Sequence, residues 1–148
     1  HLNDAATDYQ STVNIYYNMY ENSGTQYMGG FDSVTYLHEL GHAMGLAHPH
    51  DAGGDSSVFT GVSSAFNDYG TYDMNQGIYT TMTYNDGWAS SGSQATPSNS
   101  TYGYQMTPMA LDIAALQNSY GANTTYASGS NTYTLDTSNN TGTGYQCI

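Results

Sequence analysis

Residues 38–49 read HELGHAMGLAHP, which combines two histidines one helical turn apart, a glutamate between them, a glycine and a third histidine. His38 and His42 are four residues apart, so on a helix they share a face and can offer two imidazole nitrogens to one metal ion. Gly45 can adopt the left-handed conformation that ends a helix, and the resulting turn would bring His48 round as a third ligand. Three protein ligands leave a fourth position open for water, which is typical of catalytic zinc.

Glu39 stands between the two helical histidines and need not bind the metal. Its carboxylate can take a proton from a zinc-bound water, whose pKa the metal lowers to about 7. We therefore expect Glu39 to act as a general base. The alternative, an exposed helix face without chemistry, is disfavoured because the whole pattern is far more specific than two histidines and a glutamate alone.

The composition limits the partners of the chain. Its 148 residues contain no lysine or arginine and twelve acidic residues, which gives a formal net charge of -12 at pH 7. Phosphate backbones and anionic membranes would repel such a surface, so we expect no nucleic-acid and no membrane partner. No apolar run approaches the roughly 20 residues that span a bilayer. We expect a soluble, processed chain with one main domain.

Local patterns predict the secondary structure. Residues 12–17 alternate apolar and polar β-formers and are predicted to be a strand. A helix is predicted over about 33–44, capped by Asp32 or Ser33, with an apolar face of Val34, Leu37, Leu40 and Met44. Thr107 and Pro108 are predicted to open a second helix that Gly121 closes, with an inward stripe of Met109, Ile113, Leu116 and Tyr120. Residues 124–148 read as one or two short strands or a linker.

A long irregular loop is expected from Pro49 to about Gly77, because its glycines, aspartates and serines show no sustained period. Calcium is a second candidate cofactor there, because the loop offers hard oxygen ligands: Asp51, Asp55, Asp68 and Asp73. No recognisable spacing unites these carboxylates, so solvated loop side chains are the favoured interpretation.

Taken together, these residues resemble the metzincin metalloproteases and, within them, the serralysin-type secreted proteases. Leu46 and Pro49, which flank the third histidine, are similar to the serralysin branch in particular. Residues 12–16 resemble the strand before that family's active-site helix, and residues 79–84 resemble its Met-turn. Residues 108–123 resemble the helix that closes the catalytic domain. The resemblance covers about residues 12–123.

The resemblance implies an α+β, metzincin-like zinc protease domain, in which the active-site helix and a C-terminal helix pack on a mixed β-sheet. It implies a catalytic domain over 1–123 and a short β or linker segment over 124–148. It further implies a monomer that is secreted to the extracellular space. It also implies that Met82 forms a hydrophobic floor beneath the metal, and that the Tyr84 phenol either binds zinc or swings off to bond the transition state. Only one strand precedes the helix, so we expect the sheet to be completed between Gly61 and Trp88 or by a longer natural chain.

Three functions remain open. The leading one is a secreted zinc-dependent endopeptidase that hydrolyses peptide bonds of protein or peptide substrates through a zinc-bound water activated by Glu39, with His38, His42, His48 and Tyr84 as metal ligands. The second is a zinc-binding protease remnant or fragment without peptidase activity. The third is an acidic calcium-binding or adhesive module without zinc. Casein cleavage that a chelator removes and zinc restores separates the first from the second.

Overall fold

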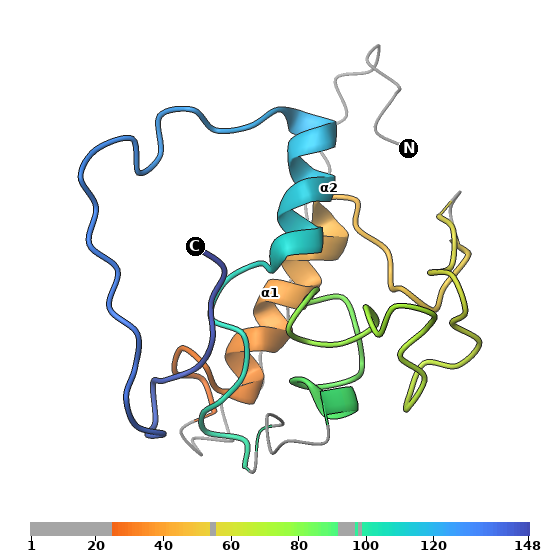
Figure 1. The fold of residues 1–148 in the computed structure, drawn as a ribbon, viewed down its shortest axis with the longest axis horizontal. Coiled ribbons are helices and arrows are strands. Elements are labelled where there is room, and N and C mark those ends of the chain that lie inside the picture. The colour runs from red at the N-terminus through yellow and green to blue at the C-terminus, as the bar shows by residue number, and fades with distance from the viewer. Residues whose placement is uncertain (1–24, 54–55, 92–96, 98) are drawn as a thin grey trace.

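The computed structural model describes residues 25–53, 56–91, 97 and 99–148. Within them the elements follow in the order α1 (Phe31–Ala43), the short 3-10 helix η2 (Ala89–Ser91) and α2 (Ala110–Tyr120). Figure 1 shows α1 and α2 running in the same sense, and apart from η2 the described residues between them form loops. The two predicted helices are therefore confirmed. Neither helix is long and apolar enough to cross a membrane.

The predicted mixed sheet is not found in the described part of the chain. The pairing present there is an isolated parallel bridge between Gln105 and Tyr145, and the predicted strand at 12–17 lies outside the described residues. Residues 61–88 do not complete a sheet, because they form turns and bends. Asn67 and Asp73 take positive φ values, and the Asp68 carboxylate accepts hydrogen bonds from the amides of Ser63 and Ser64. Local side-chain bonds of this kind replace the ladder of a strand.

Helix α1 starts two residues earlier than predicted, and the predicted cap is wrong. Its N-cap is Gly30, which has no side chain to cap with. Backbone carbonyls from elsewhere satisfy the first amides instead: the Phe31 N–H donates to the Ser100 carbonyl at 2.9 Å, and that of Asp32 to the Thr25 carbonyl at 3.1 Å. Asp32 lies in the first turn, where a negative charge complements the helix dipole.

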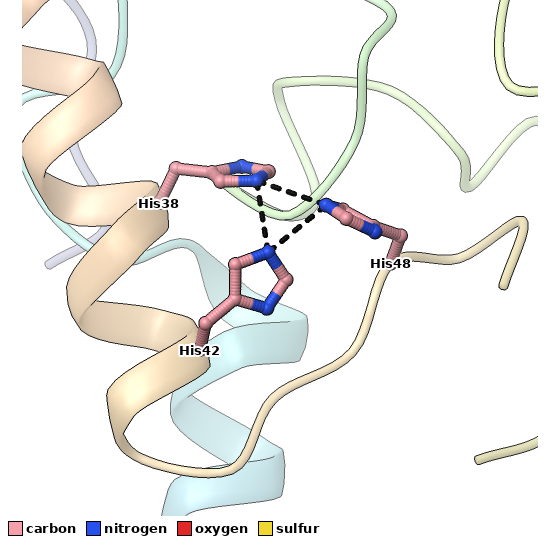
Figure 2. A group of neighbouring side chains, drawn as sticks. All are labelled: His38, His42 and His48. Atoms are coloured by element: carbon pink, nitrogen blue, oxygen red, sulfur yellow. Dashed lines mark hydrogen bonds between the residues drawn. The ribbon is translucent and has the colours of Figure 1, made fainter. Parts of the chain in front are cut away.

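The C-terminal end of α1 forms the predicted turn. Gly45 has φ +91°, its N–H donates to the His42 carbonyl at 2.9 Å, and the Leu46 N–H donates to the Gly41 carbonyl at 2.9 Å. The chain reverses there and runs back beside the helix (Figure 2). A residue with a Cβ would be strained at this backbone angle, so the turn needs its glycine.

The predicted apolar face of α1 is correct only near its start. Val34 is buried and Leu37 is half-buried, but Leu40 and Met44 are 49% and 41% exposed. The helix is instead closely packed at Gly41, where an added Cβ would overlap the Met82 sulfur. The absence of a side chain at Gly41 therefore lets the helix turn between His38 and His42 lie directly on Met82.

The predicted start at Thr107 and Pro108 is wrong, because α2 begins at Ala110 and its N-cap is Met109, whose N–H donates to the Asp112 carboxylate at 2.8 Å. The Thr107 hydroxyl instead accepts the Cys147 N–H at 2.9 Å.

Helix α2 buries a charged residue rather than a full apolar stripe. Met109 is buried, and Ile113 and Leu116 are half-buried. Tyr120, predicted to face inward, is 53% exposed, and its hydroxyl donates to the Met44 carbonyl at the end of α1 at 3.1 Å. The buried residue within α2 is Asp112. Gly121, with φ +83°, ends the helix as predicted.

The C-terminal segment leaves α2 as an exposed chain and then returns to the molecule (Figure 1). On its return it pairs with residues 103–106: the Gly103 N–H donates to the Thr143 carbonyl at 2.9 Å, and the Met106 N–H to the Tyr145 carbonyl at 2.9 Å. The division into a domain over 1–123 and a separate segment over 124–148 stays a prediction.

The described interior is largely polar. Six apolar side chains are buried, Val34, Pro49, Val62, Met82, Tyr104 and Met109, against ten polar ones, among them Asn75, Gln76, Thr83 and Asn85. The Thr83 hydroxyl donates to the Asn75 side chain at 2.6 Å, and the Asn85 amide donates to the Asn75 carbonyl at 2.9 Å. A chain without salt bridges to lysine or arginine thus relies on buried hydrogen-bond networks to hold its loops around the site.

Candidate metal centre

Three histidine side chains converge beside α1 (Figure 2). His38 and His42 extend from successive turns of α1, and His48 comes from the chain that returns after Gly45. Their Nε2 atoms lie 3.1 Å apart for His38 and His42, 3.0 Å for His38 and His48, and 2.9 Å for His42 and His48. Two ligands at 2.0–2.1 Å from one tetrahedral zinc would be about 3.3 Å apart, so the triangle has the size of a metal site.

Hydrogen bonds at Nδ1 determine which ring nitrogen carries the proton in His38 and His42. The Nδ1–H of His38 donates to the Thr81 carbonyl at 2.8 Å, and the Nδ1–H of His42 donates to the Leu46 carbonyl at 2.9 Å. A carbonyl only accepts, so each neutral ring holds its proton on Nδ1 and presents a bare lone pair on Nε2. Two lone pairs that face each other at 3.1 Å repel unless a cation lies between them. The donor set therefore fits a bound metal ion, with outer hydrogen bonds of the kind that orient metal-binding histidines.

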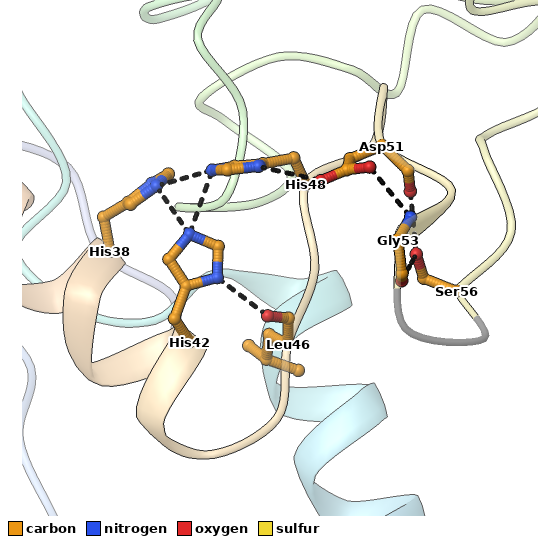
Figure 3. A network of polar contacts seen from close by, with 7 residues as sticks. All are labelled: His38, His42, Leu46, His48, Asp51, Gly53 and Ser56. Atoms are coloured by element: carbon orange, nitrogen blue, oxygen red, sulfur yellow. Dashed lines mark hydrogen bonds and ion pairs between the residues drawn. The ribbon is translucent and has the colours of Figure 1, made fainter. Parts of the chain in front are cut away.

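His48 is the third donor and is held differently. Burial and then the neighbouring His42 and His38 lower its pKa from the ordinary 6.5 to about 4, although Asp51 acts in the opposite direction. The Asp51 carboxylate lies 4.0 Å from His48 Nδ1 and accepts the Gly53 N–H at 2.8 Å, so this loop holds the acid beside the ring (Figure 3). With this pKa, His48 is neutral and able to bind metal at pH 7.

The side chains of Tyr84 and His50 lie next to the triad. The Tyr84 ring centre is 4.8 Å from that of His48 and 5.8 Å from that of His38, and the side chain is 41% exposed. His50 stacks on His48 at 4.9 Å, and its buried Nδ1 has no hydrogen-bond partner. His50 is not in the donor cluster, whereas His1 lies outside the described residues. Metal binding by Tyr84 stays a prediction.

Glu39 is exposed and lines an open cavity of about 400 Å³ together with His38 and Tyr84. The other walls combine apolar and polar side chains, among them Phe31, Val34, Phe66, Thr83 and Gln105. The residue predicted to act as a base therefore shares one cavity with a histidine of the triad. A space of this size can receive a side chain or a short stretch of peptide.

The calcium prediction gains no support from the structure. In the described part of the chain, the histidine triad is the one group of three or more His, Cys, Asp or Glu donors close enough to share an ion. Hydrogen bonds from the Ser63 backbone and hydroxyl lower the pKa of Asp68, as expected for a loop carboxylate bound by its own turn. Asp55 lies outside the described residues.

Sequence reasoning missed the residues that support the triad. Thr81 and Leu46 contribute carbonyls, which no sequence pattern marks as acceptors for a histidine. Asp112 falls within the predicted second helix but outside its predicted inward stripe, yet it is only 2% exposed. One local signal was available, because a carboxylate at the third position of a helix is typical of a capping residue.

The site combines a helix that carries two histidines and a glutamate, a glycine turn, and a third histidine that converges on the first two. This combination defines the metzincin class of metalloproteases. The comparisons specify the branch. The chain is 34% identical over 126 residues to a serralysin of Proteus mirabilis, a match that covers 85% of this chain and 23% of the relative. It is also 34% identical over 117 residues to the metallopeptidase AprA of Pseudomonas marginalis, covering 78% of this chain and 23% of that protein. The chain is a serralysin-type metzincin segment.

The match is limited in length. Serralysin C of Dickeya chrysanthemi is 34% identical over 128 residues, which is 85% of this chain and 24% of that protein. The chain therefore spans about a quarter of the length of the curated relatives it matches. No model of a protein family matches it, and no solved structure matches it.

Proposed function

We propose that this chain is the catalytic segment of a secreted zinc-dependent endopeptidase that hydrolyses peptide bonds in proteins or peptides. The observation that carries the proposal is the convergence of three Nε2 atoms within 3.1 Å of one another, beside a glutamate on the same helix. The relatives named serralysin and metallopeptidase support the same reaction class. His38, His42 and His48 hold the zinc ion in this proposal.

The residues divide the chemistry among them. A zinc ion bound by the triad supplies a Lewis acid that polarises the scissile carbonyl and makes water more acidic. Glu39 accepts the proton of the attacking water on its carboxylate and passes it to the nitrogen of the leaving amine. Tyr84, which rests against His48 at the edge of the site, either binds the metal through its phenol or donates a hydrogen bond to the negative charge that develops on the carbonyl oxygen.

The cavity beside Glu39 receives the substrate in this proposal. Its apolar walls, Phe31, Val34 and Phe66, suit an uncharged side chain next to the cleaved bond. The net charge of -12 also disfavours acidic substrates at the site.

A second candidate is a zinc-binding segment without peptidase activity. It is favoured by the lack of a sheet in the described residues, since an extended substrate in this class would need an edge strand to pair with. In that case the histidines bind metal but no substrate is held across it.

One experiment separates the two. The zinc-loaded 148-residue chain should cleave casein, lose the activity in a chelator and regain it when zinc is added back in excess. The control is the same chain with His42→Ala, which should remain inactive after zinc is added. Full zinc content without casein cleavage by the unaltered chain would contradict the endopeptidase and leave the zinc-binding segment.

Acid should release the metal. The pKa of His48 is lower in the folded chain, about 4, than its ordinary 6.5, so the unfolded chain takes up this proton first as the pH falls. The contribution of neutral His48 to the free energy of unfolding is therefore complete above about pH 6.5 and is lost as the pH falls toward about 4. Protonated histidines also cannot bind zinc, so zinc content and peptidase activity should collapse below about pH 5. Metal analysis after gel filtration at stepped pH measures this, and full zinc retention at pH 4 would contradict it.

A further inference from the structure

Asp112 is a buried carboxylate in a chain that has no lysine or arginine to pair with it. Burial of a charge without compensation is costly, so the structure must stabilise it by hydrogen bonds. Its Oδ2 accepts the Thr81 N–H at 2.7 Å, the Thr81 hydroxyl at 2.9 Å and the Met109 N–H at 2.8 Å. Its Oδ1 accepts the Thr80 hydroxyl. One carboxylate thus joins the start of α2 to the segment before Met82.

Thr81 links this carboxylate to the metal centre. Its N–H and hydroxyl both donate to Asp112, while its carbonyl accepts the Nδ1–H of His38 at 2.8 Å. The carbonyl is therefore held in place from behind by a group that is itself buried. That bond also keeps the His38 proton on Nδ1 and the Nε2 lone pair free.

The other two histidines have separate supports. His42 donates to the Leu46 carbonyl, and His48 lies beside Asp51 (Figure 3). Neither contact involves Thr81 or α2. A change at Asp112 should therefore act on the centre through His38 and leave the supports of His42 and His48 in place.

We propose that Asp112 is a positioning residue for the metal centre, which it supports through Thr81 and His38. The proposal rests on the proposed zinc site, but not on peptidase activity. Partners outside the ligands commonly change metal affinity by about 10- to 100-fold. Asp112 acts through one further residue, so Asp112→Asn should weaken zinc binding by on the order of tenfold.

A double-mutant cycle tests the route. Zinc affinity of the full chain is measured by competition with a chromophoric chelator, with circular dichroism to verify that each variant is folded. Asp112→Asn should cost about tenfold in the parent and in the His42→Ala background, but less than about twofold in the His38→Ala background. An equal loss in both histidine backgrounds would indicate general loosening of the fold and overturn the proposal, and so would unchanged affinity in the parent background.

A second variant serves if Asp112→Asn does not fold. Thr81→Val removes one hydrogen bond to Asp112 but keeps the β-branched shape and the carbonyl that His38 uses. It should weaken zinc binding by about threefold, again only where His38 is present. Unchanged affinity in this variant would overturn the proposal. If the parent chain binds no zinc, both the proposed function and the positioning role fail. If the parent binds zinc and Asp112→Asn binds it equally well, only the positioning role is refuted.

Discussion

Replacing Glu39 by glutamine is expected to lower peptidase activity by about 10²-fold or more while zinc stays bound. The amide keeps the size and shape of the side chain but cannot accept a proton from water. Glu39 is exposed on α1 and borders the same cavity as His38, so the substitution should neither disturb packing nor remove a zinc ligand. The kcat on a peptide substrate and the zinc content of the same sample measure the two effects.

The control for Glu39→Gln is Asp73→Asn, which removes one negative charge from an exposed loop position. Asp73 has φ +55°, a conformation that asparagine tolerates well, so this variant should fold normally and keep full activity. Full activity of Glu39→Gln would refute the assignment of the base. Loss of zinc from that variant would mean that the carboxylate belongs to the metal site.

The triad could be predicted from the sequence because its geometry is local. All three histidines fall within residues 38–48, and helix periodicity with one glycine turn suffices to bring their Nε2 atoms together. The bounds of α1 were less predictable. Its first amides bind the carbonyls of Thr25 and Ser100, and the latter residue is far away in sequence, so no local cap marks the start.

The supports of the site could not be predicted, because they join distant segments. Thr81 is 43 residues from His38, and Asp112 is 31 residues beyond Thr81. Apolar periodicity also misplaced part of the inner face of each helix: Leu40 and Tyr120 are exposed, whereas Gly41 and Asp112 are buried. In a chain with a largely polar interior, hydrogen-bond partners rather than apolar residues decide which face turns inward.

The same reasoning explains why the sheet prediction failed between residues 61 and 88. This segment is rich in side chains that bind their own backbone, and the Asp68 carboxylate alone receives the amides of Ser63, Ser64 and Gly70. Asn85 ties the segment together by accepting the Asn67 N–H at 2.7 Å. These bonds take up the donors that a strand would offer to a neighbour.

Replacing Tyr84 by phenylalanine should lower kcat by about 10²- to 10³-fold if its phenol stabilises the charge on the carbonyl oxygen, since loss of one such donor has this effect in other hydrolases. The ring itself should stay in place, because it packs against the rings of His48, His50 and Phe66 at 4.8–5.3 Å between centres. The KM should change little because the ring still borders the cavity. The matched control is Tyr126→Phe, which removes the hydroxyl of a side chain that is 79% exposed and should leave kcat unchanged.

Zinc affinity distinguishes the two roles of Tyr84. A phenol that only bonds the transition state contributes nothing to the resting metal centre, so Tyr84→Phe would bind zinc as tightly as the parent. If the phenol binds the metal, its removal in Tyr84→Phe would weaken zinc binding and would shift the absorption spectrum of the cobalt-substituted chain. Unchanged kcat together with unchanged zinc affinity would contradict both roles and reduce Tyr84 to a packing partner of His48.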